Sequence, residues 1–164
     1  MSHIKSFQWR SLSFSTPQDS DDNMHFLYYK LDTRDGGDFQ ATTFIHGITP
    51  NSQQAFTGLM IRGELTTNSY YAAILVSHQQ DYIRMYYRNY DGNDYNQWTS
   101  RVTLPNTDNY FLRLAKEGNE VRSYFKSEDA AAWSYYDSEV IDGLDNDESL
   151  YIGTFVVSGE LDER

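Results

Sequence analysis

The sequence contains no cysteine among its 164 residues. This absence excludes a disulfide framework and any site that depends on a thiolate. The sequence also lacks an apolar run near the roughly 20 residues that a membrane-spanning helix needs, and its N-terminus has no charged segment followed by an apolar one. We therefore expect no membrane span, and any export signal would lie outside this sequence.

Positive charge is also scarce. Thirteen lysines and arginines stand against 24 aspartates and glutamates, which gives a net charge of −11. Proteins that bind nucleic acid present a basic surface to the phosphates, so the charge argues against a nucleic-acid partner. Tyrosine is abundant instead, with 14 residues, beside three tryptophans. Two interpretations remain open: a β protein with hydrated outer faces, or a surface that stacks on flat ligands.

Length and patterning predict one all-β domain over residues 1–164, large enough to bury roughly two-thirds of its unfolded surface. Short β-branched and aromatic runs alternate with turn signals, and only Ser127 to Ala132 could form a single helical turn. This pattern predicts a two-sheet antiparallel β-sandwich of the jelly-roll kind. The expected strands are Phe7–Ser15, Met24–Lys30, Phe39–Ile48, Thr57–Arg62, Tyr70–Ser77, Asp81–Tyr90, Trp98–Leu104, Asn109–Lys116, Glu120–Lys126, Trp133–Ile141 and Leu150–Ser158.

The expected strand over Asp81–Tyr90 shows the clearest alternation. Ile83, Met85 and Tyr87 share one face, which predicts a core surface. The opposite face carries tyrosines and arginines, among them Arg84, Tyr86 and Arg88. The same period of two places Arg62, Arg113, Arg122 and Tyr124 away from the core on other strands.

These arginines and tyrosines predict a binding surface, since guanidinium groups donate to hydroxyls or carboxylates and phenol rings stack. The alternative is that they solvate a sheet face and pair with Asp and Glu. An arginine cluster in so acidic a protein needs anions, which come either from its own carboxylates or from an acidic ligand.

Several motifs resemble a bacterial branch of the concanavalin A-like lectin/glucanase superfamily, the regulation-of-enolase-like branch. They are the GLMIR run at Gly58–Arg62, the NSYYAA run from Asn68, and the IRMYYR run at Ile83–Arg88. The FLRL run at Phe111–Leu114 is similar as well, and the resemblance spans about residues 24–159. It implies a concanavalin A-like sandwich whose curved sheet binds ligands on its outer face.

The resemblance also implies carbohydrate as the ligand and favours a secreted or cell-surface location over the cytoplasm. The candidate ligand-binding residues are Arg62, Arg84, Tyr86, Arg88, Arg113, Arg122, Tyr124 and Trp133. The Glu-x-Asp-x-x-Glu motif of the glucan-hydrolysing relatives is absent, and the four histidines lack metal-ligand spacing. We therefore expect a noncatalytic recognition module that needs no cofactor.

Two other functions stay open: a glycan-active enzyme on the same fold, and a protein–protein or adhesion module of a larger polypeptide. A glycan ligand, acidic or neutral, is the favoured partner.

The acidic segment Asp142–Glu148 allows two interpretations. Its oxygen-rich side chains suit a structural Ca²⁺, with Asp142, Asp145 and Asp147 as candidate ligands. It does not follow the spacing of an EF-hand loop, so a solvated turn is the alternative.

Overall fold

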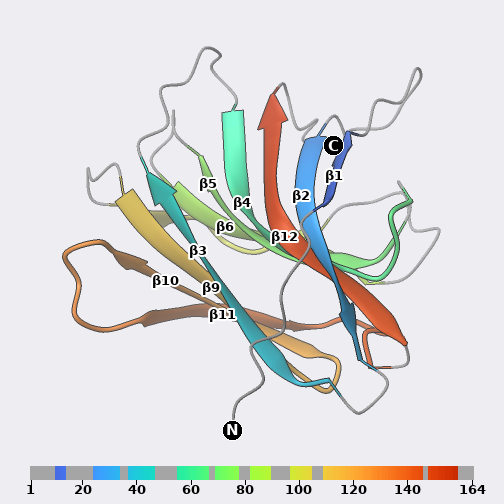
Figure 1. Cartoon of the computed structure of the whole chain (residues 1–164). Helices are drawn as coiled ribbons and strands as arrows, with labels where there is room; N and C mark the ends of the chain where they lie inside the picture. The colour runs from blue at the N-terminus through green and yellow to red at the C-terminus, as the bar shows by residue number, and fades with distance from the viewer. Residues whose placement is uncertain are drawn as a thin grey trace, which may run out of the picture.

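A computed structural model describes residues 10–13, 24–33, 37–46, 55–66, 69–77, 82–89, 97–104, 109–145 and 148–158. Every regular element within these ranges is a β-strand (Figure 1). None of the described residues forms a helix that is long and apolar enough to cross a membrane.

The strands form two antiparallel sheets that pack face to face (Figure 1). The large sheet has the order β1-β2-β12-β4-β5-β6-β7, and β8 pairs with β6. Its strands are β1 (Arg10–Ser13), β2 (Met24–Asp32), β12 (Ser149–Ser158), β4 (Ala55–Arg62), β5 (Tyr71–Ser77), β6 (Tyr82–Arg88), β7 (Gln97–Trp98) and β8 (Val102–Thr103). The small sheet has the order β11-β10-β9-β3, with β11 (Ser134–Val140), β10 (Glu120–Ser127), β9 (Asn109–Glu117) and β3 (Phe39–His46).

The predicted fold class is confirmed, and most predicted strands lie within two residues of the observed ones. One strand was wrong: Trp98–Leu104 divides into β7 and β8, which are separated by Thr99–Arg101. Thr99 leaves the strand to donate its amide hydrogen to the Met85 carbonyl at 3.0 Å. The first predicted strand, Phe7–Ser15, lies partly outside the described residues, and its described part is β1.

The main core lies between the two sheets. Ile61, Ile74 and Met85 of the large sheet face Leu112 and Leu114 of the small sheet, and all five are fully buried. The predicted inward face of β6 is thus confirmed. Burial of each such side chain stabilises the fold by about 1.5–3 kcal/mol.

The large sheet has a second apolar cluster on its outer face. Phe26, Phe155, Tyr71 and Leu75 belong to it, and none of them is more than 5% exposed. Every residue of β5 is buried, which explains why Tyr-Ala-Ala-Ile-Leu-Val-Ser shows no alternation of apolar and polar residues. The outward face of this sheet is therefore not the open, solvated surface that the alternation predicted.

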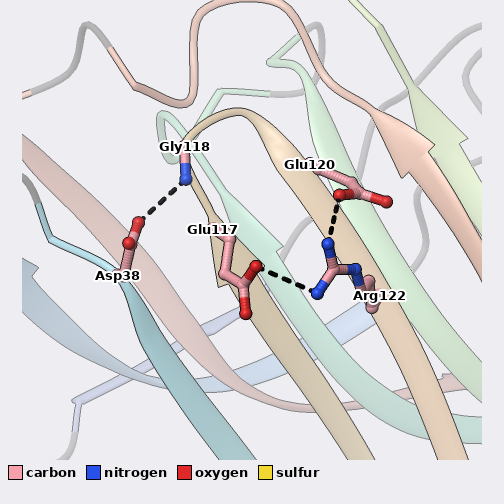
Figure 2. A network of polar contacts seen from close by, with 5 residues as sticks. All are labelled: Asp38, Glu117, Gly118, Glu120 and Arg122. Atoms are coloured by element: carbon pink, nitrogen blue, oxygen red, sulfur yellow. Dashed lines mark hydrogen bonds and ion pairs between the residues drawn. The ribbon is translucent and has the colours of Figure 1, made fainter.

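The hairpin between β9 and β10 turns at Gly118, in the gap between two of the predicted strands. Gly118 has a φ of +58°, a conformation that glycine adopts without steric cost. The Gly118 amide donates a hydrogen bond of 2.8 Å to Asp38 Oδ1, just before β3 (Figure 2). This contact ties the hairpin to the edge strand of the small sheet.

Candidate functional site

The predicted binding residues do not share one face of the molecule. Arg62 on β4 and Arg84, Tyr86 and Arg88 on β6 project from the outer face of the large sheet, since their partners in register belong to the outer cluster. The other four belong to the small sheet or its margin: Arg113 on β9, Arg122 and Tyr124 on β10, and Trp133 just before β11. The two groups lie on different sheets of the sandwich, so the prediction of a single continuous surface was wrong.

Arg62 serves the structure of a turn. It has no exposed surface, its Nε donates to the Glu64 carbonyl at 2.7 Å, and its second guanidinium nitrogen donates to the Thr66 carbonyl. The guanidinium thus holds the chain that follows β4. Because it is fully buried, Arg62 is not accessible to a ligand in this structure, contrary to its predicted role.

An open pocket of about 400 Å³ lies beside this turn. It is lined by Gly63, Glu64, Leu65, Thr66, Glu148, Ser149 and Tyr151. Two exposed glutamates dominate its chemistry, so the pocket offers acceptors rather than the arginine donors that the sequence pattern predicted.

Arg88 is also buried, with 5% of its surface exposed. Its guanidinium lies 5.3 Å from the centroid of the Tyr71 ring and donates to the Ser69 carbonyl at 3.3 Å. These contacts join the end of β6 to the start of β5. Arg88 therefore supports the sheet in the same way as Arg62.

Arg84 lies at the centre of an aromatic group. Its guanidinium carbon is 5.6 Å from the Tyr82 ring centroid and 5.8 Å from those of Tyr86 and Trp98. One terminal nitrogen donates to the Tyr86 hydroxyl at 3.3 Å. Arg84 Nε is buried and has no hydrogen-bond partner in the described part of the chain. A buried donor without a partner costs about 1–3 kcal/mol, and the surrounding rings keep a ligand from this atom.

Trp98 and Arg101 complete this group, and the sequence interpretation did not include them. Trp98 pairs in register with Tyr86, their ring centroids are 6.1 Å apart, and 39% of Trp98 is exposed. Arg101 is exposed and lies 4.6 Å over the Tyr82 ring. The sequence could have identified them by their position, because they lie in the segment after β6 that pairs back onto β6 through β7 and β8. We call Tyr82, Arg84, Tyr86, Trp98 and Arg101 the Arg84 cluster.

Burial raises the pKa of the Tyr82 hydroxyl, with a further contribution from Tyr86, and the neighbouring Arg101 and Arg84 act in the opposite direction. Tyr82 therefore stays a neutral phenol at physiological pH. The net charge of the Arg84 cluster is that of its two guanidinium groups.

Arg122 on the small sheet is occupied by neighbouring carboxylates. Its guanidinium contacts Glu117 at 2.9 Å and Glu120 at 2.8 Å (Figure 2). Hydrogen bonds from Arg122 and Ser138 lower the pKa of Glu120, and the same carboxylates raise the pKa of Arg122. The sequence left open that the outward arginines pair with the protein's own carboxylates, and Arg122 does so.

The other three small-sheet candidates contact aromatic rings. Arg113 lies 3.9 Å from the Trp133 ring centroid, and Tyr124 packs edge-on against Tyr135 with centroids 5.7 Å apart. All three are partly exposed. A ligand could therefore reach them.

Tyr136 on β11 links the small sheet to the segment between β7 and β8, near the Arg84 cluster. The Tyr136 hydroxyl lies 2.7 Å from Thr99 Oγ1 and also donates to the Ser100 carbonyl. The pKa of the Tyr136 hydroxyl is raised by burial, and the hydrogen bond with Thr99 acts in the opposite direction without cancelling this shift. Tyr136 thereby fixes the segment between β7 and β8 that carries Trp98 and Arg101.

The candidate calcium ligands are only partly covered by the structure. Asp142 and Asp145 are exposed, and Asp147 lies outside the described residues. The Asp142 amide donates to Asn89 Oδ1 at 2.8 Å, which ties the acidic segment to the end of β6. No group of three potential metal ligands occurs among the residues that the structure describes.

No protein-family model matches the sequence, and a search of curated proteins also finds no match. Solved structures do match. A functionally unknown protein from Saccharomyces cerevisiae aligns with a TM-score of 0.64 and 16% identity, over 93% of this chain and 86% of that one.

Two further matches are described as carbohydrate-binding modules. The module CBM66 from Bacillus subtilis aligns with a TM-score of 0.54 and 12% identity, over 91% of this chain and 90% of that one. The CBM2 module of the evolved Dit of Lactobacillus casei BL23 phage J-1 gives 0.55 and 13%, over 93% and 70%. At these identities the similarity establishes the fold alone, a two-sheet antiparallel β-sandwich.

Proposed function

We propose that this protein is a noncatalytic carbohydrate-recognition module that binds glycans at the Arg84 cluster. The observation that carries the proposal is the Trp98 indole on the edge strand β7, which is 39% exposed, pairs in register with Tyr86 and lies 5.8 Å from the Arg84 guanidinium. The similarity in fold to two carbohydrate-binding modules supports it. The resemblance to the bacterial concanavalin A-like branch, whose ligands bind the outer face of the curved sheet, supports the same location.

The chemistry of the cluster suits a sugar ring. Trp98 presents an indole that is 39% exposed, and apolar ring faces of sugars stack on such surfaces. Arg101 is exposed and supplies a charged donor that can hold a ring hydroxyl or a carboxylate. The buried Arg84 guanidinium lies against the Trp98 ring and supports it. Tyr82 and Tyr86 are buried, so they fix the guanidinium groups rather than stack on the ligand themselves.

The experiment begins with an array of neutral and uronate-containing oligosaccharides, followed by titration calorimetry with the strongest hit. We expect Trp98→Ala to weaken binding by about 1–3 kcal/mol, which is roughly 5- to 150-fold. Arg84→Lys should weaken it comparably, because lysine retains the charge but loses the planar guanidinium that packs among the three rings and supports Trp98.

Val102→Ala is the matched control. Val102 is also an exposed apolar residue of this edge, but its partner in register, Ile83, faces the main core, so it lies on the opposite face from the Arg84 cluster. Affinity should be unchanged in this variant. Equal losses in Trp98→Ala and Val102→Ala, or no binding to any glycan on the array, would defeat the proposal.

The proposal includes one expectation that rests on the resemblance, a secreted or cell-surface location. The enzyme alternative is tested on the same hits. Incubation of each bound glycan with the protein, followed by chromatography of the products, should show no cleavage.

A further inference from the structure

The outer face of the small sheet has two distinct halves. In register, Phe44 on β3 lies beside Phe111 on β9, which lies beside Lys126 on β10. The next row contains Thr42, Arg113, Tyr124 and Tyr135. These two rows, with Trp133, form what we call the aromatic half.

Large aromatic surfaces are accessible in the aromatic half. Phe44 is 41% exposed and Tyr135 is 57% exposed. The rings also contact one another: Phe44 and Phe111 have centroids 4.5 Å apart, and Phe111 and Trp133 have centroids 6.4 Å apart. Three successive rings therefore cross the sheet from β3 towards β11.

Two cations lie against these rings. The Arg113 guanidinium is 3.9 Å from the Trp133 centroid, and Lys126 Nζ is 5.0 Å from that of Phe111 and 5.6 Å from that of Trp133. Arg113 Nε donates to Thr42 Oγ1, a neutral acceptor, at 3.3 Å. Neither cation forms an ion pair with a carboxylate of the described ranges. In a protein of net charge −11, this half concentrates unneutralised positive charge.

In the other half of the face, the arginine forms ion pairs with carboxylates of the same sheet. Arg122 lies between Glu117 and Glu120, and Asp38 accepts from the Gly118 amide (Figure 2). The same sheet thus carries one arginine that its own carboxylates neutralise and one that they do not. Among the described residues of this face, Arg113 and Lys126 lie in the aromatic half and form no ion pair with a carboxylate.

We propose that the aromatic half is a second glycan-binding site, selective for sugars that carry a carboxylate or sulfate. The rings stack on the apolar faces of successive sugars, and Arg113 and Lys126 receive the anionic groups. This site is separate from the Arg84 cluster and does not rest on it, since the two lie on different sheets.

The size of the aromatic half favours a glycan over a folded protein. Four strands about 4.8 Å apart and two rows of side chains cover roughly 20 Å by 14 Å. That area is well below the roughly 800 Å² that each partner contributes to a stable protein interface. It matches a short oligosaccharide segment instead.

The test uses a hexamer of polygalacturonate, a sulfated dextran oligomer and a neutral dextran oligomer as probes, titrated into Trp98→Ala protein. This background removes stacking at the Arg84 cluster, so failure at that site leaves this measurement intact. We expect both anionic probes to bind and the neutral one to bind at least tenfold more weakly. Affinity should fall as salt is raised, because the charges on this face are partly exposed.

Matched substitutions then locate the site. Arg113→Gln should weaken binding of the hexamer at least tenfold, whereas Arg122→Gln, which removes the same charge from the same sheet, should change it less than twofold. Thermal melting of both variants checks that each remains folded. If the melting temperature of Arg113→Gln falls, Lys126→Gln provides the second measurement of the same prediction.

Three outcomes would overturn the proposal. One is that neither anionic probe binds the Trp98→Ala protein. Another is that Arg122→Gln loses as much affinity as Arg113→Gln and Lys126→Gln. The third is concentration-dependent dimerisation in sedimentation experiments that Arg113→Gln abolishes and the hexamer does not displace, since the face would then be an interface between two copies.

Discussion

The Tyr87 hydroxyl on β6 donates a hydrogen bond to the Glu139 carboxylate on β11 and so connects the large sheet to the small one. Burial raises the pKa of Glu139 above its ordinary value of 4.5, and the negative charge of Asp137 adds to this effect. The hydrogen bond from Tyr87 acts in the opposite direction but does not cancel the shift. The interface between the sheets therefore contains a carboxyl that holds its proton more tightly than an exposed glutamate does.

This relationship predicts how stability depends on pH. The folded protein holds the Glu139 proton more tightly than the unfolded chain, so this group's contribution is fully present below pH 4.5. This contribution to the free energy of unfolding decreases as the pH rises above 4.5 and through the raised pKa of Glu139 in the folded protein. Glu139→Gln, whose amide oxygen still accepts from Tyr87, should flatten that decline. Urea denaturation at a series of pH values from about 2 to 8 measures it.

Glu120→Gln is the control for that measurement. The Arg122 hydrogen bond lowers the pKa of Glu120, so this carboxylate contributes stability above its ordinary pKa and loses it as pH falls. Its removal should affect the opposite, acidic end of the curve. A Glu139→Gln protein with an unchanged pH dependence would show that Glu139 is not the responsible group.

Arg62 should be a stability residue. Arg62→Met retains most of the side-chain volume but leaves the carbonyls of Glu64 and Thr66 without their charged donor. We expect the free energy of unfolding to decrease by about 2–4 kcal/mol, as measured by chemical denaturation. Glycan affinity of the folded fraction should stay unchanged, and a selective loss of affinity would restore Arg62 as a binding residue.

Gly153 on β12 is expected to tolerate no side chain. A Cβ there would come within 2.7 Å of Tyr28 Cα and still closer to the Leu27 carbonyl oxygen, both on the neighbouring strand β2. Gly153→Ala should therefore destabilise the fold by about 3 kcal/mol, because backbone atoms must move. Gly118→Asn is the control: its Cβ meets no atom within 4 Å, and asparagine tolerates positive φ, so thermal melting should change little.

Calcium binding by the acidic segment Asp142–Glu148 would stabilise the folded protein. If Asp142, Asp145 and Asp147 hold Ca²⁺, EDTA should lower the melting temperature and excess calcium should restore it, since a ligand of the folded state stabilises by mass action. Asp145→Asn should remove that response. A melting curve that EDTA does not change leaves the solvated turn.

The sequence by itself determined the fold class, most strand positions and the inward face of β6. Alternation along Asp81–Tyr90 separated Ile83, Met85 and Tyr87 from Arg84, Tyr86 and Arg88 correctly, because the two sides of a strand follow from local geometry with a period of two. The turn at Gly118 is a local property as well, because glycine adopts a positive φ without steric cost. Each of these properties depends on residues close together in the chain.

Only the tertiary structure decided which outward faces belong together. Arg84 and Arg113 both point away from the main core, yet they lie on different sheets, because β6 pairs with β5 whereas β9 pairs with β10 and β3. The sequence did not show which arginines are buried either. Arg62 and Arg122 both alternate with apolar residues in a strand, but Arg62 is fully buried, whereas Arg122 is partly exposed between two glutamates. Strand pairing and burial arise from contacts between distant segments, such as β12 with β2, and the period of a single strand carries no information about its partners.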